Sequence, residues 1–144
     1  IYADKYQITN LGTSLRLGTF CHENGHLLCG FPDLYDYDTG VDDSNGSGRY
    51  SILWVSGSYH PVGVGAYLRY HAGWAETVGM DAASHFRVSV RVDDGPLYQY
   101  FNPAASNEYF LVENRSNDYG WEDGSSMPDD GLMIIHCDDD GNSR

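Results

Sequence analysis

Basic residues are scarce in this sequence: 8 Lys and Arg stand against 21 Asp and Glu, so the formal net charge at pH 7 is −13. A surface of this sign repels the phosphate groups of nucleic acid and of anionic lipid, and we expect neither as a partner. The sequence also lacks an apolar run of about 18 residues, the length that a membrane-spanning helix needs. We therefore expect no insertion into a membrane.

Cysteine is rare as well, and its count is odd: Cys21, Cys29 and Cys137. On one helix, Cys21 and Cys29 would lie about 12 Å apart, which is too far for a disulfide between them. Either of them could pair with Cys137. The alternative is that Cys21 and Cys29 are small buried apolar side chains.

What the chain does contain is enough apolar material for a core. Its 144 residues favour a single domain. Hydrophobic residues make up 41% of the chain, and 12 tyrosines are present, which indicates a globular protein rather than a disordered one.

The segment with the clearest chemistry is His22-Glu23-Asn24-Gly25-His26. On a helix, positions four apart lie on one face, so His22 and His26 can direct two imidazoles at one metal ion. Glu23 stands next to them and can take a proton from a water bound to that ion. This pattern is typical of zinc-dependent hydrolases, in which the ion lowers the pKa of its water to about 7.

We predict a helix that begins after an N-cap at Thr13 or Ser14 and ends at Gly30, because Pro32 cannot continue it. Five residues at helical spacing form its apolar stripe: Leu17, Phe20, Cys21, Leu27 and Leu28. The two histidines fall on a different face, together with Gly18 and Gly25. Because glycine has no side chain, glycines at these positions would allow another segment to pack close to that face.

Residues 33–50 read as a polar loop, followed by a short apolar strand or turn over residues 50–55. Four carboxylates of the loop are candidate calcium ligands: Asp36, Asp38, Asp42 and Asp43. Their spacing does not match an EF-hand, and the alternative is a solvated acidic loop.

A second helix is predicted over residues 62–77, after Pro61. The pattern then changes to period two, and we predict strands over residues 86–92, 97–101, 109–114 and 132–137. The expected fold class is α+β, with two helices followed by an antiparallel β segment. A polar loop occupies residues 117–130.

The His-Glu-x-Gly-His motif, followed by Pro-Asp-Leu-Tyr-Asp over residues 32–36, resembles the immune inhibitor A family of secreted zinc metallopeptidases, which look like relatives of the metzincins. Further stretches carry the resemblance in the same order: residues 56–59, 67–74, 108–115 and 131–136. The resemblance extends from about Gly12 to His136.

This resemblance implies a secreted zinc endopeptidase that acts on proteins or peptides. Residues 1–80 would form the zinc-binding helical part, and residues 81–144 a β-rich part of the same domain or the start of the next. His22 and His26 would bind zinc with Asp33 as third ligand, Glu23 would be the general base, and Tyr59 would donate a hydrogen bond to the oxyanion.

Two departures from the family pattern bear on this site. Cys29 stands where the family has Gly, and Asp33 lies one residue further from His26 than the family's Asp. Trp54 stands where metzincin-like enzymes have a Met beneath the metal. Other side chains therefore remain open as third ligand: Asp36, Asp38, His60, Glu76 and, more remotely, Cys29.

Metzincin-like domains have a β-sheet before the active-site helix, whereas only 21 residues precede His22. The resemblance thus implies that the chain is a piece of a longer secreted precursor, whose signal and missing N-terminal part lie upstream. Two rival hypotheses remain. One is a catalytically drifted, metal-stabilised extracellular binding module, and the other is an acidic calcium-binding domain in which His-Glu-x-x-His is incidental.

Overall fold

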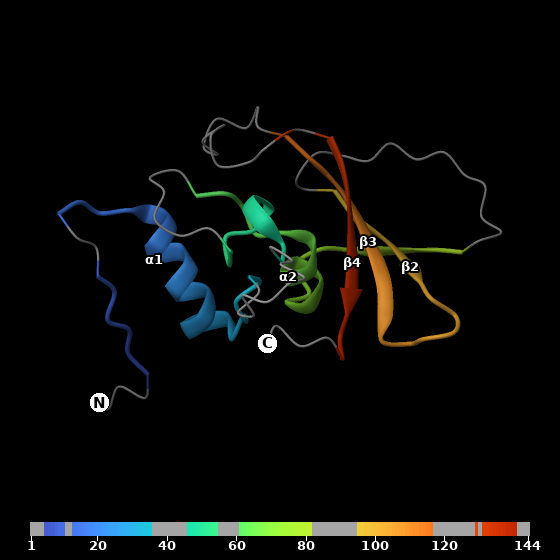
Figure 1. Ribbon diagram of the computed structural model, residues 1–144, viewed down its shortest axis with the longest axis horizontal. Helices are drawn as coiled ribbons and strands as arrows, with labels where there is room; N and C mark the ends of the chain where they lie inside the picture. The colour runs from blue at the N-terminus through green and yellow to red at the C-terminus, as the bar shows by residue number, and fades with distance from the viewer. Residues whose placement is uncertain are drawn as a thin grey trace, which may run out of the picture. The chain divides into compact units, whose positions relative to one another are not determined.

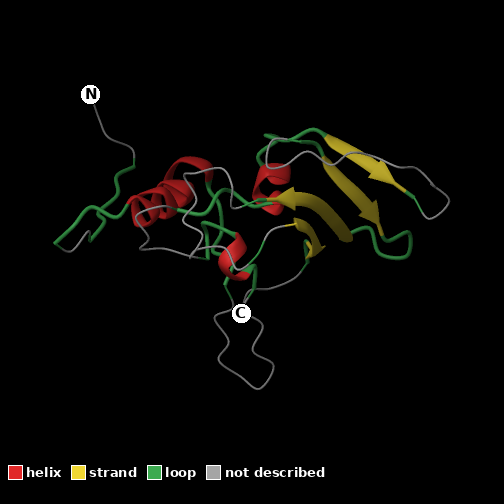
Figure 2. Ribbon diagram, turned by 90° about the horizontal axis from the view of Figure 1, so that it is seen from above, coloured by secondary structure: helices red, strands yellow, loops and turns green. Residues whose placement is uncertain are grey.

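The computed structural model describes residues 5–10, 13–35, 46–54, 61–81, 95–116, 129 and 131–140. Its described part contains two α-helices and a four-stranded sheet, so the fold is a mixed α+β fold (Figures 1 and 2). The chain divides into two compact units: Ile1–Gly65 with Asn117–Pro128 and Ser143–Arg144, and Ala66–Ser116 with Asp129–Asn142. Among the described helices, none is long and apolar enough to cross a membrane. The expected division near residue 80 stays a prediction.

The first unit is built around the helix α1, Leu17–Asn24, which continues as the π-helical turn η1, Gly25–Cys29. The predicted N-cap was wrong, because Arg16 occupies that position and provides no side-chain cap. The predicted end is confirmed: Gly30 has a φ of 67°, a left-handed conformation that glycine adopts without a steric penalty.

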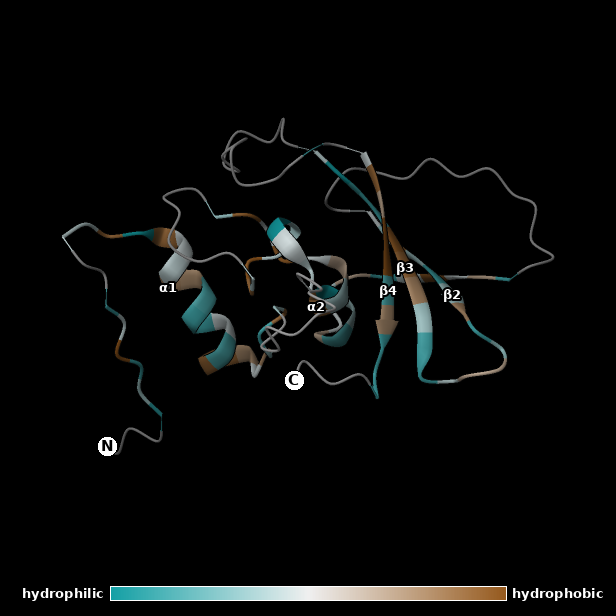
Figure 3. Cartoon of the chain, viewed as in Figure 1, coloured by the Kyte–Doolittle hydropathy of each residue, from teal (hydrophilic) through white to brown (hydrophobic). Residues whose placement is uncertain are grey.

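The face of α1 that is buried is not the predicted apolar one. Leu17, Phe20 and Leu28 are 47%, 48% and 75% exposed, whereas His22 is only 6% exposed. In Figure 3 the helix carries both hydrophobic and hydrophilic residues along its length. The apolar stripe is therefore largely exposed, and the face that carries the glycines and the histidines packs, as the small residues there had indicated.

The partner of that buried face is the segment Ser51, Ile52 and Leu53, whose members are 1%, 4% and 0% exposed. It follows the 3-10 helix η2, Gly48–Tyr50, and turns back through a hydrogen bond from the Trp54 amide to the Ser51 carbonyl at 3.0 Å. The apolar strand or turn expected over residues 50–55 is thus a buried turn in its described part.

The second unit begins with the helix α2, Ala66–His71, which is much shorter than the predicted helix. It ends because Gly73 has a φ of 68° and the Trp74 amide bonds back to the Arg69 carbonyl at 2.9 Å. The predicted helix end at residue 77 was wrong, since a strand, β1, Thr77–Met80, begins there.

The sheet has the order β1-β2-β3-β4. Its other strands are β2, Leu97–Phe101, β3, Glu108–Arg115, and β4, Gly131–Asp138, so three predicted strands are confirmed. β2, β3 and β4 pair antiparallel as expected, but β1 pairs parallel with β2, so the sheet is mixed. The strand predicted over residues 86–92 lies outside the described residues.

One face of the sheet packs against α2 and forms the core of the unit: Ala66, Leu97, Tyr109, Leu111 and Cys137. On the other face, Leu132 and Ile134 of β4 remain 61% and 64% exposed. In β3 and β4 the alternating pattern thus reflects one buried and one open face, whereas in β2 the neighbouring residues Leu97, Tyr98 and Gln99 are all buried.

A buried ion pair joins α2 to β3. Glu113 is 2% exposed, accepts a hydrogen bond from the Arg69 guanidinium at 2.6 Å, and accepts another from the Ala66 amide at 3.2 Å. Arg115, 4% exposed, has a guanidinium nitrogen 3.9 Å from the same carboxylate. This carboxylate thus ties the start of the helix to the centre of the sheet.

The thiol of Cys137 lies in that core, whereas Cys29 is exposed and Cys21 is half-buried. All three cysteines are among the described residues and all are free, so neither the disulfide to Cys137 nor the burial of Cys29 is found. Burial, assisted by the negative charge of Asp139, raises the pKa of the Cys137 thiol to about 12.

We predict that Glu113→Ala lowers the free energy of unfolding by about 3–5 kcal/mol, because the Arg69 charge loses the carboxylate that compensates it. Urea titration followed by circular dichroism measures this. Glu108→Ala, on the same strand but with a side chain that is 38% exposed, should change stability by less than about 0.5 kcal/mol. Equal effects of the two variants would contradict the assignment.

We also predict that iodoacetamide at pH 9 labels Cys29 in the folded protein and leaves Cys137 unlabelled until urea unfolds the chain. With a pKa of about 12, only roughly one Cys137 thiol in a thousand is ionised at that pH, and the thiolate is the reactive form. Peptide mapping by mass spectrometry distinguishes the sites. Labelling of Cys137 at the rate of Cys29 would show that the core thiol is accessible.

Candidate metal site

The site begins where the first helix ends. At Gly30 the left-handed conformation reverses the chain, and the turn is held by hydrogen bonds from the Gly30 amide to the His26 carbonyl and from the Phe31 amide to the Gly25 carbonyl, at 3.1 and 3.2 Å. Phe31 is then buried at 8% exposure. This reversal returns Asp33 to the helix face that carries the histidines.

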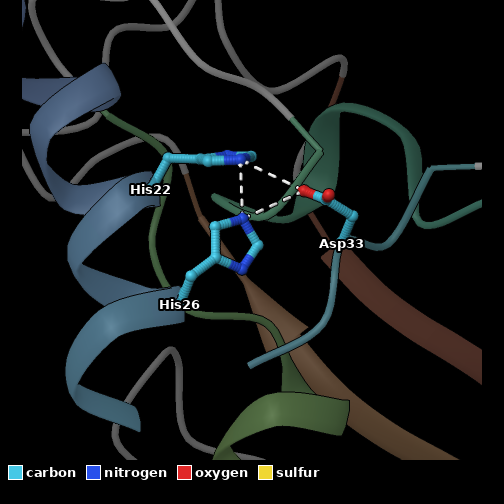
Figure 4. Close-up of side chains that lie close together, drawn as sticks. All are labelled: His22, His26 and Asp33. Atoms are coloured by element: carbon cyan, nitrogen blue, oxygen red, sulfur yellow. Dashed lines mark hydrogen bonds and ion pairs between the residues drawn. The ribbon is translucent and has the colours of Figure 1, made fainter. Parts of the chain in front are cut away.

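Three side-chain atoms converge there (Figure 4). The Nε2 atoms of His22 and His26 are 3.2 Å apart, and each lies 3.2 Å from Oδ1 of Asp33. A tetrahedral ion with metal–ligand bonds of about 2.0–2.1 Å holds its ligand atoms about 3.3 Å apart. The cluster of His22, His26 and Asp33 could therefore hold a metal ion.

The opposite nitrogen of each ring is held by the backbone. Nδ1 of His22 lies 2.8 Å from the Ile52 carbonyl oxygen, and Nδ1 of His26 lies 2.6 Å from the Phe31 carbonyl oxygen. A carbonyl can only accept, so in each neutral ring Nδ1 carries the proton and Nε2 presents a lone pair. Backbone partners of this kind fix the tautomer and the orientation of metal-binding histidines.

Three electron-rich atoms that face one another in this way need a positive charge or a proton between them. Two imidazole lone pairs and a carboxylate oxygen face one another at hydrogen-bond distance. One proton can bridge only one of the three pairs, whereas a metal ion is attracted to all three atoms at once. These three residues fit a metal ion on their own geometry.

A π-helical turn precedes the reversal that returns Asp33 to the site. A π-helical turn contains more residues than an α-helical turn, and such turns occur frequently at functional sites. Here the turn Gly25–Cys29 includes His26 and lies immediately before the reversal.

The remaining candidates differ in what the structure shows of them. Glu23 lies on α1 beside His22 and is half-buried. Glu76 is exposed and belongs to the second unit, and neither it nor Cys29 is part of the cluster formed by the described residues. Trp54 is half-buried at the end of the buried turn.

The other predicted site residues lie outside the described part of the chain: Asp36, Asp38, Asp42, Asp43, Tyr59 and His60. The calcium site, the oxyanion donor and the alternative ligands among these residues therefore stay predictions.

Sequence reasoning missed the carbonyl groups of Ile52 and Phe31, which orient the two imidazoles. Every residue has a carbonyl, so no residue type identifies these acceptors. The one indirect signal was the small residue Gly25 on the histidine face, which indicated that another segment comes close.

Comparison with protein-family models, with curated proteins and with solved structures finds no match for this chain.

We predict that Asp33→Ala weakens Zn²⁺ binding by more than the roughly 10–100-fold that loss of an outer-sphere partner causes, because a direct ligand is removed. Competition with a chromogenic chelator measures the affinity. Glu76→Ala is the matched control, since Glu76 is an exposed carboxylate in the other unit, and it should bind Zn²⁺ like the wild type. The reverse order of effects would assign the third ligand to Glu76.

Proposed function

We propose that this chain is the zinc-binding part of a secreted endopeptidase that hydrolyses proteins or peptides. The observation that supports it is the convergence of His22 Nε2, His26 Nε2 and Asp33 Oδ1 at 3.2 Å, directly beside a glutamate on the same helix. Among the described residues the cluster offers three protein ligands, the number that catalytic rather than structural zinc sites have.

Two imidazole nitrogens and one carboxylate oxygen also agree with zinc as the ion. Imidazole suits zinc and other late transition metals, whereas calcium and magnesium prefer ligand sets made only of oxygen atoms. When bound, such an ion supplies Lewis acidity, which polarises a carbonyl group and makes a nearby water more acidic. His22, His26 and Asp33 would hold the ion, and the Ile52 and Phe31 carbonyls would orient the rings.

Glu23 is the proposed general base. It is half-buried and next in sequence to a ligand, so its carboxylate can accept a proton from the attacking water. The same group then gives that proton to the amine that leaves when the peptide bond breaks. Tyr59 is the proposed hydrogen-bond donor to the oxyanion. The zincin-like fold and the secreted location belong to this proposal too, on the resemblance of the motifs.

The experiment that tests the proposal is Glu23→Gln. The amide keeps the size of the side chain but cannot accept the proton, so we expect unchanged zinc content and a loss of casein hydrolysis of about 10²–10⁴-fold. Elemental analysis gives the zinc content, and release of soluble peptides gives the rate.

His26→Ala is the companion variant, and it should lose both zinc and hydrolysis. Hydrolysis that continues unchanged in Glu23→Gln would refute the assigned base. A wild-type protein that binds zinc but cleaves no substrate would favour the metal-stabilised binding module instead.

A further inference from the structure

Gly25 lies in the helix at a place where a side chain would not fit freely. A Cβ atom on Gly25 would lie 3.2 Å from Cδ2 of Leu53, and 3.6 Å from both Cδ1 of Leu53 and a ring carbon of Phe31. The backbone of Gly25 has a φ of −56°, which any residue adopts. The glycine is therefore required by the closeness of its neighbours and not by its own conformation.

These neighbours belong to the two segments that orient the histidines. Phe31 carries the carbonyl that holds Nδ1 of His26, and Leu53 directly follows Ile52, whose carbonyl holds Nδ1 of His22. The two segments are also joined to each other, because the Leu34 amide donates to the Leu53 carbonyl at 3.0 Å. Gly25 thus lies next to both segments, the one that contains Phe31 and the one that contains Leu53.

Neither neighbour can easily move away. Leu53 is fully buried and Phe31 is 8% exposed, so a displaced side chain would meet other packed atoms rather than solvent. A methyl group at position 25 would lie 3.2 Å from Cδ2 of Leu53, so Leu53 would have to move by a few tenths of an ångström, whereas the 3.6 Å contact with Phe31 is an ordinary one. That displacement would reach the carbonyl of Ile52, directly before Leu53, and through it the imidazole ring of His22.

We propose that Gly25 and Leu53 form a positioning pair for the metal site: their contact sets the distance between the helix and the Ile52 carbonyl, and so the position of the His22 ring and the spacing of the two Nε2 atoms. Gly25 and Leu53 do not themselves bind the ion. The inference deepens the proposed function, because it concerns the affinity of the same site.

A purely structural role makes the opposite prediction for one variant. Alanine forms helices better than glycine does, so Gly25→Ala should make the metal-free fold at least as stable if local helix formation is all that matters. If Gly25 positions the site, the same variant should bind metal more weakly. Helix propensity favours alanine, whereas crowding against the buried Leu53 opposes it, so the stability of the metal-free fold and the affinity for Zn²⁺ are measured separately.

The test compares three variants with the wild type: Gly25→Ala, the double variant Gly25→Ala with Leu53→Val, and Leu111→Val. Valine lacks the Cδ atoms that would meet the new methyl group, so the double variant moves volume from position 53 to position 25. Leu111→Val is the matched control, because Leu111 is equally buried but belongs to the sheet of the other unit.

We expect Gly25→Ala to weaken Zn²⁺ binding about 10–100-fold, as loss of an outer-sphere partner does, and the double variant to recover most of that affinity. Leu111→Val should bind Zn²⁺ like the wild type. Thermal unfolding of the metal-free proteins should show that Gly25→Ala is still folded, with a loss of stability limited to the crowding against Leu53.

A second readout needs neither zinc nor hydrolysis. Proton NMR of the metal-free wild type should show the two Nδ1 protons that the backbone carbonyls protect from exchange. The signal of His22 should weaken or shift in Gly25→Ala and return in the double variant. Unchanged Nδ1 signals and unchanged affinity in Gly25→Ala would overturn the proposal. A wild type that binds zinc without proteolysis would refute only the proposed endopeptidase.

Discussion

The two hydrogen bonds between imidazole Nδ1 atoms and backbone carbonyls are the interactions on which the site in the first unit depends. They determine which nitrogen of His22 and of His26 carries the lone pair, and they aim both lone pairs at the carboxylate of Asp33. Each acceptor lies in a different segment, at residues 31 and 52, so the helix, the chain reversal and the buried turn must all be in place. The orientation of the two metal-binding rings therefore depends on the packing of the whole unit.

The sequence predicted those features that depend on local rules. The spacing of His22 and His26 placed both rings on one helix face, and Gly30 marked the end of the helix, because these results follow from helical geometry and from the freedom of glycine at positive φ. The strands β2, β3 and β4 were recognisable because a sheet with one buried face imposes an alternating pattern.

What could not be predicted depends on contacts between distant residues. Leu17, Phe20 and Leu28 have the right period for a buried stripe, but period alone does not say which helix face is buried. β1 was not predicted, because its four residues are too few to show a pattern, and the predicted helix extended into its first residue, Thr77. Its parallel pairing with β2 depends on how the chain crosses between the two strands. The π-helical turn has no recognisable sequence signal, although it lies directly before the reversal that returns Asp33 to the histidines.

The compactness of the ligand set affects how the site can assemble. His22, His26 and Asp33 all belong to residues 22–33, so bringing them together closes only a short loop and loses little chain entropy. The three ligand atoms can therefore come together within one helix and its reversal, and the Ile52 carbonyl, 30 residues from His22 in the sequence, adds its orientation from outside that segment.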